Sequence, residues 1–312
     1  MPYLSRSATA LLATAFLGIA IIGYVAGHSR SQSAAAEKTL TASGTSLSLN
    51  YPATWRAASA APKIPGLAIA HPLVLAPGGE ATQAGLVAGQ LAGGEAAPLP
   101  TTLLTLMPTL PETAVVDLLG TQAYRYTHVD VTGFDHQLTL YAIPSPGGQE
   151  SLLACYASAS LSSYMRTCEH IVASLTLPGQ SQTYDLTPSA SYARELTTSI
   201  GALDAQRSSL RHEMSAHTTS SAAQTYAHRL VAAYTRAAAS LSKLEPSPVA
   251  GAAQTTLTRS IVQTSDAYKA FAAAAAEEST AGLAAAGKQV DEAETSVQDA
   301  LDQFALLGYA QA

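Results

Sequence analysis

Charged residues are scarce in this chain, and neither sign is concentrated. Lys, Arg, Asp and Glu make up 12% of the 312 residues, and the net charge is −6 at pH 7. Binding to nucleic acid requires a concentrated basic surface, so this composition excludes nucleic acid as a partner. Aromatic residues are also few, at 6%, with Trp55 as the only tryptophan. The hydrophobic content of 47% is nevertheless sufficient, over this length, for two folded domains.

The chain has one long run without charge or proline, and it lies at the start. As a helix, residues 8–26 would span roughly 28 Å, close to the hydrocarbon thickness of a bilayer. We therefore predict a transmembrane anchor within residues 1–27, followed by a Ser- and Ala-rich linker over 28–38. A cleaved signal peptide is the alternative, because small residues follow at Val25-Ala26-Gly27. Gly23 and Gly27, four residues apart, leave self-association through this helix open.

Cysteine is nearly absent, and its two occurrences bear on location. Arg6 precedes the apolar run while Arg30 and Lys38 follow it, so the distribution of basic residues hardly sets the orientation. Cys155 and Cys168 form an even pair in a chain with an export signal, which indicates one disulfide. A redox role is disfavoured because they do not form a Cys-x-x-Cys motif. We therefore expect a single-pass protein of the cell membrane, with a cytoplasmic N-terminus and an extracytoplasmic bulk.

Residues 39–178 have the texture of an α/β domain, in which short β-type segments alternate with Pro- and Gly-containing turns. The pattern Leu47-Ser48-Leu49-Asn50-Tyr51 alternates apolar and polar residues, as a half-buried strand does. Further strands are predicted at 67–75, 84–91, 114–118, 122–131, 136–143 and 151–157, with hairpin turns around Gly133 and at 144–148. Helices are predicted at 101–107 and 161–175. The second helix gathers apolar residues on one face.

This domain resembles the PsbP-like α/β family. The resemblance rests on Leu47 to Trp55, which reads as a strand followed by Tyr-Pro-x-x-Trp, and on Gly120-Thr121-Gln122-Ala123-Tyr124-Arg125-Tyr126. It continues in the segment from Cys155 through Cys168 to Leu175. Actinobacterial envelope proteins of the LpqN lipoprotein group look similar, although they carry a lipid-modified cysteine where this chain has an apolar run. The resemblance implies a twisted antiparallel sheet covered by helices, and a binding or assembly role without family catalytic residues.

The remainder of the chain has helical periodicity. A polar linker over 179–186 precedes residues 187–312, in which apolar residues recur at steps of three and four in four segments. The segments run from about 192 to 214, 226 to 244, 257 to 275 and 283 to 304. Their length and short links predict an antiparallel four-helix bundle. We expect Pro188 and Pro248 at first helical positions and a capping box at Ser221 and Gln224. The fold class is thus α+β, with an anchor, a sheet domain and a bundle.

Two groups of residues are candidates for holding a metal. His212 and His217 resemble the histidines of a zinc-binding helix, but at a spacing of five residues their imidazoles point about 140° apart. A surface site of mixed ligands could form around the hairpin from His128, Asp130, Asp135 and His136, yet hairpin tips are polar in any case. We therefore assign no metal, no cofactor and no catalytic residue.

The sequence leaves the partner unnamed but indicates a class of function. A membrane-anchored, extracytoplasmic binding or scaffolding protein with a protein partner in the envelope fits best, and we expect no enzyme. The alternative is a carrier of an apolar small molecule or lipid, in a pocket of the α/β domain or of the bundle.

Overall fold

The computed structural model describes residues 39–44, 47–60, 62–91, 98–144, 150–177, 185–216 and 219–309. The anchor and linker predicted over residues 1–38 lie outside these ranges. Within the ranges, no helix combines the length and the apolar character needed to cross a membrane.

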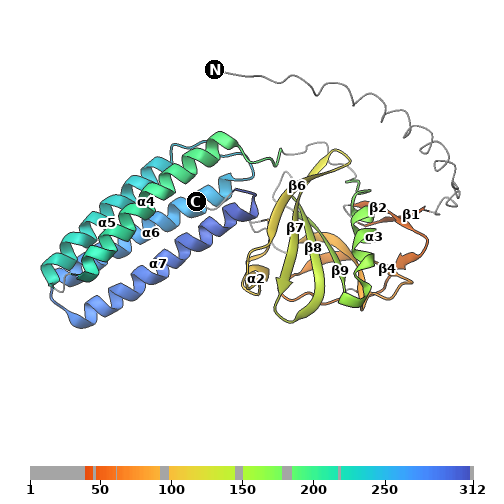
Figure 1. The fold of residues 1–312 in the computed structure, drawn as a ribbon, viewed down its shortest axis with the longest axis horizontal. Helices are drawn as coiled ribbons and strands as arrows, with labels where there is room; N and C mark the ends of the chain where they lie inside the picture. Colours follow the sequence, from red (N-terminus) through yellow and green to blue (C-terminus); the bar gives the residue numbers. More distant parts are fainter. Residues whose placement is uncertain are drawn as a thin grey trace, which may run out of the picture. The chain divides into compact units, whose positions relative to one another are not determined.

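Two antiparallel sheets make up the first part of the described chain (Figure 1). The larger sheet has the strand order β3-β4-β5-β9-β8-β7-β6, and the smaller one is the hairpin β1-β2. The strands are β1 (Thr39–Ser43), β2 (Ser48–Pro52), β3 (Trp55–Ala57), β4 (Ile69–Pro77), β5 (Ala84–Leu91), β6 (Glu112–Leu118), β7 (Thr121–Val131), β8 (Phe134–Pro144) and β9 (Glu150–Ala157). The helical turns of this part are α2 (Thr101–Leu104), η1 (Ala159–Leu161) and α3 (Ser163–Val172).

The larger sheet buries apolar side chains on both faces. Strand β9 lies at its centre, and its residues from Ser151 to Ala157 are all buried. One face, which includes Leu153 and Cys155, packs against Ile171 and Val172 of α3. The opposite face carries a second core that includes Tyr124 and Tyr126. A strand that is buried on both faces has a nearly continuous run of apolar residues in its sequence, and β9 has such a run from Leu152 to Ala157.

The predicted strands and the hairpin around Gly133 are confirmed. Strand β5 has the predicted bounds, and Trp55 is a core residue, 1% exposed. Strand β1 was missed: its residues Thr39–Ser43 alternate polar and apolar side chains, but the strand is only five residues long and none of its side chains is fully buried. The helix predicted at 161–175 is shorter than expected. It begins after the turn η1 and ends at Val172, since the chain must leave the helix for Thr176 to bridge to Ser48.

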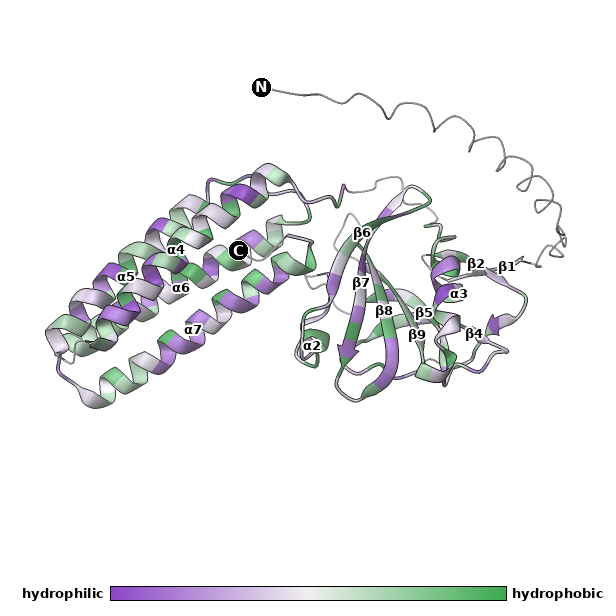
Figure 2. Cartoon of the chain, viewed as in Figure 1, coloured by the Kyte–Doolittle hydropathy of each residue, from purple (hydrophilic) through white to green (hydrophobic). Residues whose placement is uncertain are grey.

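Four long helices make up the second part of the described chain and confirm the four predicted segments. They are α4 (Ala190–Ala216), α5 (Ser220–Leu241), α6 (Gly251–Ala276) and α7 (Thr280–Leu306). Figure 2 shows hydrophobic and hydrophilic residues interspersed along α7. The buried side chains of α4, α5 and α6 recur mainly at steps of three and four, as expected for helices with one apolar face. Many of the buried positions are alanine, including Ala227, Ala233 and Ala272, which permits close approach of the helices.

The predicted helix starts were wrong by two to three residues. Helix α4 begins at Ala190, where the hydroxyl of Ser189 accepts from the backbone N–H of Tyr192 at 3.4 Å. The expected capping box is replaced by Thr219, whose hydroxyl accepts from the N–H of Ala222 at 3.3 Å. In both helices the cap is a serine or threonine just before the first turn, where its hydroxyl can accept from a free backbone N–H group. The residues that the sequence pattern favoured lie outside this position. Likewise α6 begins at Gly251, beyond a turn that contains Pro248.

Candidate binding site

A groove of about 760 Å³ lies in the α/β domain, between α3 and the hairpin β7–β8. Its floor is the part of the sheet face that α3 leaves open, and α3 contributes Met165 and Glu169 to one wall. The side chains that can form hydrogen bonds in the groove include Arg125, Thr127, Gln137 and Thr139. In Figure 2 the end of β8 that adjoins the β7–β8 turn is coloured hydrophilic. The groove therefore offers both hydrogen-bonding and charged side chains, and the charged ones include Asp130, Asp135 and Glu169.

An irregularity in β7 lies along this groove. The pairing of β7 with β8 shifts between Tyr126 and Val129, and His128 has a positive φ of 54°. Two residues therefore separate Tyr126 and Val129, which both remain buried in the opposite core. Such a bulge bends the strand and increases its twist. Thr127 and His128, the two residues within this irregularity, both line the groove.

The position of α3 beside the groove is fixed by a disulfide. Cys155 of β9 and Cys168 of α3 are joined, with their Cα atoms 5.8 Å apart, as the sequence predicted. Both are buried. In the chain-entropy model, closing a loop of this length stabilises a fold by about 3 kcal/mol. The helix that forms one wall is thus covalently tied to the central strand of the sheet.

An ion pair crosses the groove wall. The Arg125 guanidinium donates to the Glu169 carboxylate at 2.6 Å, and both side chains are one-third exposed. Partial burial lowers the pKa of Arg125, but the hydrogen bond to Glu169 and the proximity of Tyr141 outweigh it, so that this pKa is raised. Burial, followed by the negative charge of Glu169, raises the pKa of Tyr141 to about 12. Arg125 is therefore a permanent cation held in place by its neighbours.

All four residues considered for a hairpin metal site line this groove, but they do not converge. The Nδ1 atom of His128 lies 3.3 Å from the Glu112 carboxylate, on the adjoining strand. The ring of His136 stacks on Phe134 at 4.9 Å, and its Nε2 atom lies 3.1 Å from the Thr82 carbonyl oxygen. No group of three or more potential ligands gathers anywhere in the described ranges. Asp130 and Asp135 are lining residues only.

The His212–His217 pair cannot be compared as a whole, because His217 lies outside the described residues. His212 is on α4, and the adjacent Glu213 contacts Arg229 of α5 at 3.9 Å. This carboxylate therefore belongs to a contact between two helices.

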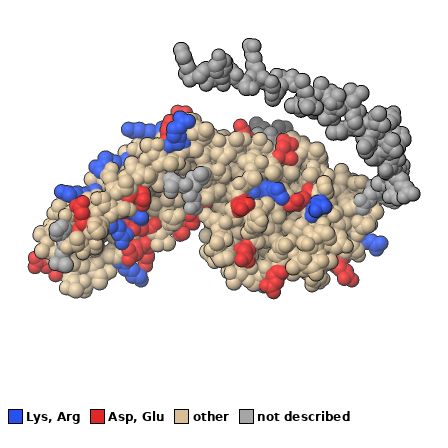
Figure 3. Space-filling view, in the orientation of Figure 1, with Lys and Arg blue, Asp and Glu red and all other residues tan. Residues whose placement is uncertain are grey.

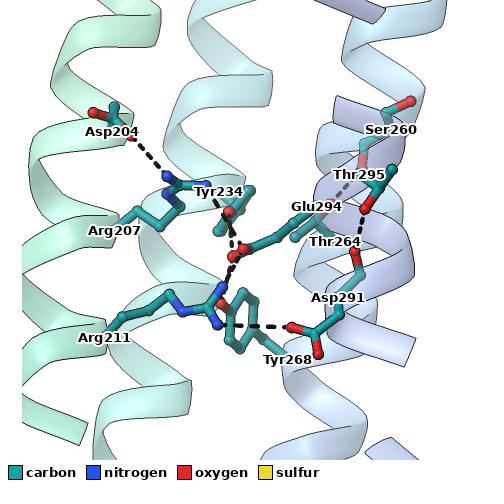
Figure 4. Close-up of polar contacts among 10 residues, drawn as sticks. All are labelled: Asp204, Arg207, Arg211, Tyr234, Ser260, Thr264, Tyr268, Asp291, Glu294 and Thr295. Atoms are coloured by element: carbon teal, nitrogen blue, oxygen red, sulfur yellow. Dashed lines mark hydrogen bonds and ion pairs between the residues drawn. The ribbon is translucent and has the colours of Figure 1, made fainter. Parts of the chain in front are cut away.

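A second polar site, missed by the sequence reasoning, lies inside the bundle and centres on Glu294 of α7 (Figure 4). Its side chain is 10% exposed. The carboxylate accepts hydrogen bonds from the hydroxyls of Tyr234 at 3.0 Å and Tyr268 at 2.6 Å. It also accepts from the Arg211 guanidinium, and Arg207 lies 3.6 Å away. Each of the four helices thus contributes at least one member.

The electrostatics of this cluster follow from its burial. Burial raises the pKa of Tyr234 and of Tyr268, and the adjacent Glu294 carboxylate raises both further. Burial alone would lower the pKa of Arg211, but the attraction of Glu294 raises it overall. The tyrosines therefore stay neutral donors and the arginine stays charged. The arrangement supplies the buried carboxylate with donors from three other helices, and such a network favours one register of the four helices.

The sequence did contain a signal for this cluster. Arg207 interrupts the apolar stripe of its helix, and Glu294 lies between the core residues Val290 and Val297. A basic residue and an acidic residue in two core stripes of one bundle point to a buried pair. The helical spacing of Tyr234 and Tyr268 predicts that both side chains pack in the core of the bundle. Their rings are buried as predicted, but their hydroxyls also donate to the Glu294 carboxylate, which the spacing does not predict.

No protein-family model matches the chain, and no curated protein matches it. Among solved structures, it is similar to the solution structure of cyanobacterial PsbP (CyanoP) from Synechocystis sp. PCC 6803. The identity is 12% and the TM-score is 0.32, and the match covers 48% of this chain and 99% of that one. At these values the match assigns neither a family nor an activity.

Proposed function

We propose that this protein is a membrane-anchored, extracytoplasmic binding or scaffolding protein of the cell envelope, without catalytic activity. In this proposal residues 8–26 hold it in the membrane, and the groove beside α3 receives a protein partner. The kinship with PsbP-like and LpqN-type envelope proteins is part of the same proposal.

The observation that carries the proposal is the construction of the groove. One wall is tied to the sheet by the Cys155–Cys168 disulfide and by the Arg125–Glu169 ion pair. A site held in this way loses little conformational entropy when a partner binds. A disulfide is also typical of proteins that fold outside the cytoplasm.

The chemistry of the groove favours a polar polypeptide as the partner. Thr139 supplies a hydroxyl, and Gln137 supplies an amide that can both donate and accept. The hydroxyl of Thr127 also lines the groove and donates to the Glu112 carboxylate at 3.5 Å. Peptide groups need donors and acceptors of this kind, whereas an apolar cargo would leave them unpaired. These residues therefore support a protein partner over a carried lipid.

Location is tested with a reporter fused after Ala312. We expect activity from a reporter that works only outside the cytoplasm, and no labelling of Cys155 or Cys168 by thiol reagents in the native protein. Activity from a cytoplasmic reporter would overturn the topology.

Binding is tested with a photo-crosslinking amino acid at Thr127 in the full chain, in membranes. We expect a discrete crosslinked protein that is absent when the probe replaces Lys269, an exposed residue of α6. Crosslinks to lipid alone would favour the carrier function instead, and no crosslink at either position would refute binding in the groove.

A further inference from the structure

A second groove, of about 460 Å³, runs over the outer face of α4 and α5. Its apolar part is made of small or partly covered side chains, with Ala205 and Leu210 from α4 and Ala232 from α5. A shallow channel between two helices with alanine in its floor suits the ridge of a third helix. This groove is separate from the one beside α3.

The groove has positive charge on its α5 side. Arg229 and Arg236 both line it, and they lie seven residues apart on one face of the helix. At 1.5 Å per residue their Cα atoms are roughly 10 Å apart along the axis. Figure 3 shows Lys and Arg side chains recurring along the upper edge of the bundle, where α4 and α5 lie.

The existing contacts of these arginines leave their charge available. Arg236 donates to the amide oxygen of Gln206 at 2.6 Å, which is a neutral partner. Arg229 lies 3.9 Å from Glu213, with side chains that are 60% and 43% exposed, and its guanidinium lies over the ring of Tyr226, 5.6 Å from the ring centroid. An exposed pair at that distance contributes little stability, so it can be exchanged for another carboxylate.

The outward face of α7 has the complementary pattern. Glu292 and Asp299 are exposed, again seven residues apart, on the side of the helix away from the buried Glu294. Lys288 lies one turn before Glu292, with its Nζ atom 3.5 Å from the Glu292 carboxylate, and this exposed pair contributes little stability and can be exchanged. Between them lie Thr295 and Ser296, whose hydroxyls donate to carbonyl oxygens of the preceding turn. The side chains between the two carboxylates are therefore small, and the hydroxyls of Thr295 and Ser296 already have hydrogen-bond acceptors.

We propose that the α4–α5 groove binds the outward face of α7 from a second copy of this chain. Arg229 and Arg236 pair with Glu292 and Asp299, whose equal spacing allows both pairs to form at once. The small residues of α7 rest on the alanine floor of the groove. The interface is narrow and its charges are exposed, so the association is weak and sensitive to salt.

The two surfaces lie on different faces of one bundle, which determines the type of assembly. Each copy offers one groove and one acidic face, so contacts run head to tail, and they produce rings or open chains of copies instead of a two-fold dimer. This inference is independent of the proposed binding at the α3 groove. It adds a scaffolding role without requiring the membrane anchor.

Sedimentation of the full chain, at constant detergent concentration and low salt, tests the proposal. We expect the mean mass to rise with protein concentration between about 10 µM and about 1 mM, the range typical of small interfaces. The double variant R229E/R236E and the double variant E292K/D299K should each lose this rise. A mixture of the two variants should recover it, because the reversed groove of one then meets the reversed face of the other.

A matched control is R194E/R259E, which makes the same change in net charge at exposed positions outside the groove lining. It should associate as the unmodified chain does. A constant mass over the whole concentration range would overturn the proposal. Association that persists in both reversed variants would also overturn it, because the contact would then lie elsewhere, such as in residues 8–26.

Discussion

Replacing the buried carboxylate, Glu294→Gln, should destabilise the bundle substantially. The glutamine keeps an oxygen that can accept from the tyrosine hydroxyls, but it removes the negative charge facing Arg207 and Arg211. A hydrogen bond to a charged group contributes about 1.5–3 kcal/mol, and two such bonds to tyrosine become neutral ones. The arginine side chains are 37% and 41% exposed, so they can partly hydrate once their partner is lost.

Together these terms give an expected loss of about 2–3 kcal/mol in the free energy of unfolding. With a urea dependence of about 2–3 kcal/mol per M, the midpoint should fall by roughly 1 M. Helix content followed by far-ultraviolet circular dichroism reports this transition, because the long helices dominate that signal. The control is Glu195→Gln on the exposed face of α4, which should change stability by less than about 0.5 kcal/mol.

The reasoning is refuted if Glu294→Gln behaves like the control. That result would mean that hydration of the arginines compensates fully for the loss of the pair. A double-mutant cycle with Arg211→Gln separates the two effects. We expect a coupling energy of at least about 1 kcal/mol if the pair contributes directly.

Two further substitutions follow from the sheet. Leu119 and Gly120 form the two-residue turn between β6 and β7, with φ values of 53° and 88°, and the Leu119 side chain is 71% exposed. Asparagine tolerates a positive φ better than leucine does, so Leu119→Asn should stabilise the α/β domain by about 1 kcal/mol. The fluorescence of Trp55 during urea unfolding checks this, with Leu119→Ile, which tolerates positive φ less well, as the destabilising counterpart. Burial raises the pKa of Glu150 to about 8, so the native state retains a proton that the unfolded state releases. The protonated carboxyl therefore favours the native state at low pH, and this stabilisation is lost as the pH rises from about 4.5 towards 8. Glu150→Gln should remove that pH dependence when unfolding is measured between pH 4 and pH 9, and an unchanged slope would show that the carboxyl is hydrated.

Local patterns in the sequence were sufficient for most of the fold. The alternation around Leu49, the turn at Gly133 and the four apolar stripes each reflect the burial of one face, and burial is encoded by neighbours in the chain. The disulfide was predictable for the same reason, because Cys155 and Cys168 lie on consecutive elements that must pack together. The end of α3 was not predictable, since it depends on pairing between Thr176 and Ser48, more than a hundred residues apart.

The sites were harder to predict than the elements. The lining of the groove beside α3 includes the bulge after Tyr126, and no residue type in that strand requires a bulge. Histidines and aspartates near the hairpin suggested a metal, but their directions depend on separate partners such as Glu112 and Thr82. The Glu294 cluster combines residues from four helices, so only the unusual polarity of two core positions reveals it in the sequence.

The composition of the Glu294 cluster has a consequence for the order in which the chain folds. Arg207, Arg211, Tyr234 and Tyr268 are all synthesised before Glu294, and none of the three earlier helices supplies the carboxylate that these side chains share. Until α7 is made, packing of the first three helices would bury the hydroxyls of Tyr234 and Tyr268 without their acceptor, which opposes early compaction. Arg207 already has Asp204 on its own helix, 3.0 Å away, so the tyrosines are the groups that depend on α7. Completion of the bundle is therefore tied to the synthesis of α7, and a chain that stops before α7 should stay open to solvent and to proteases.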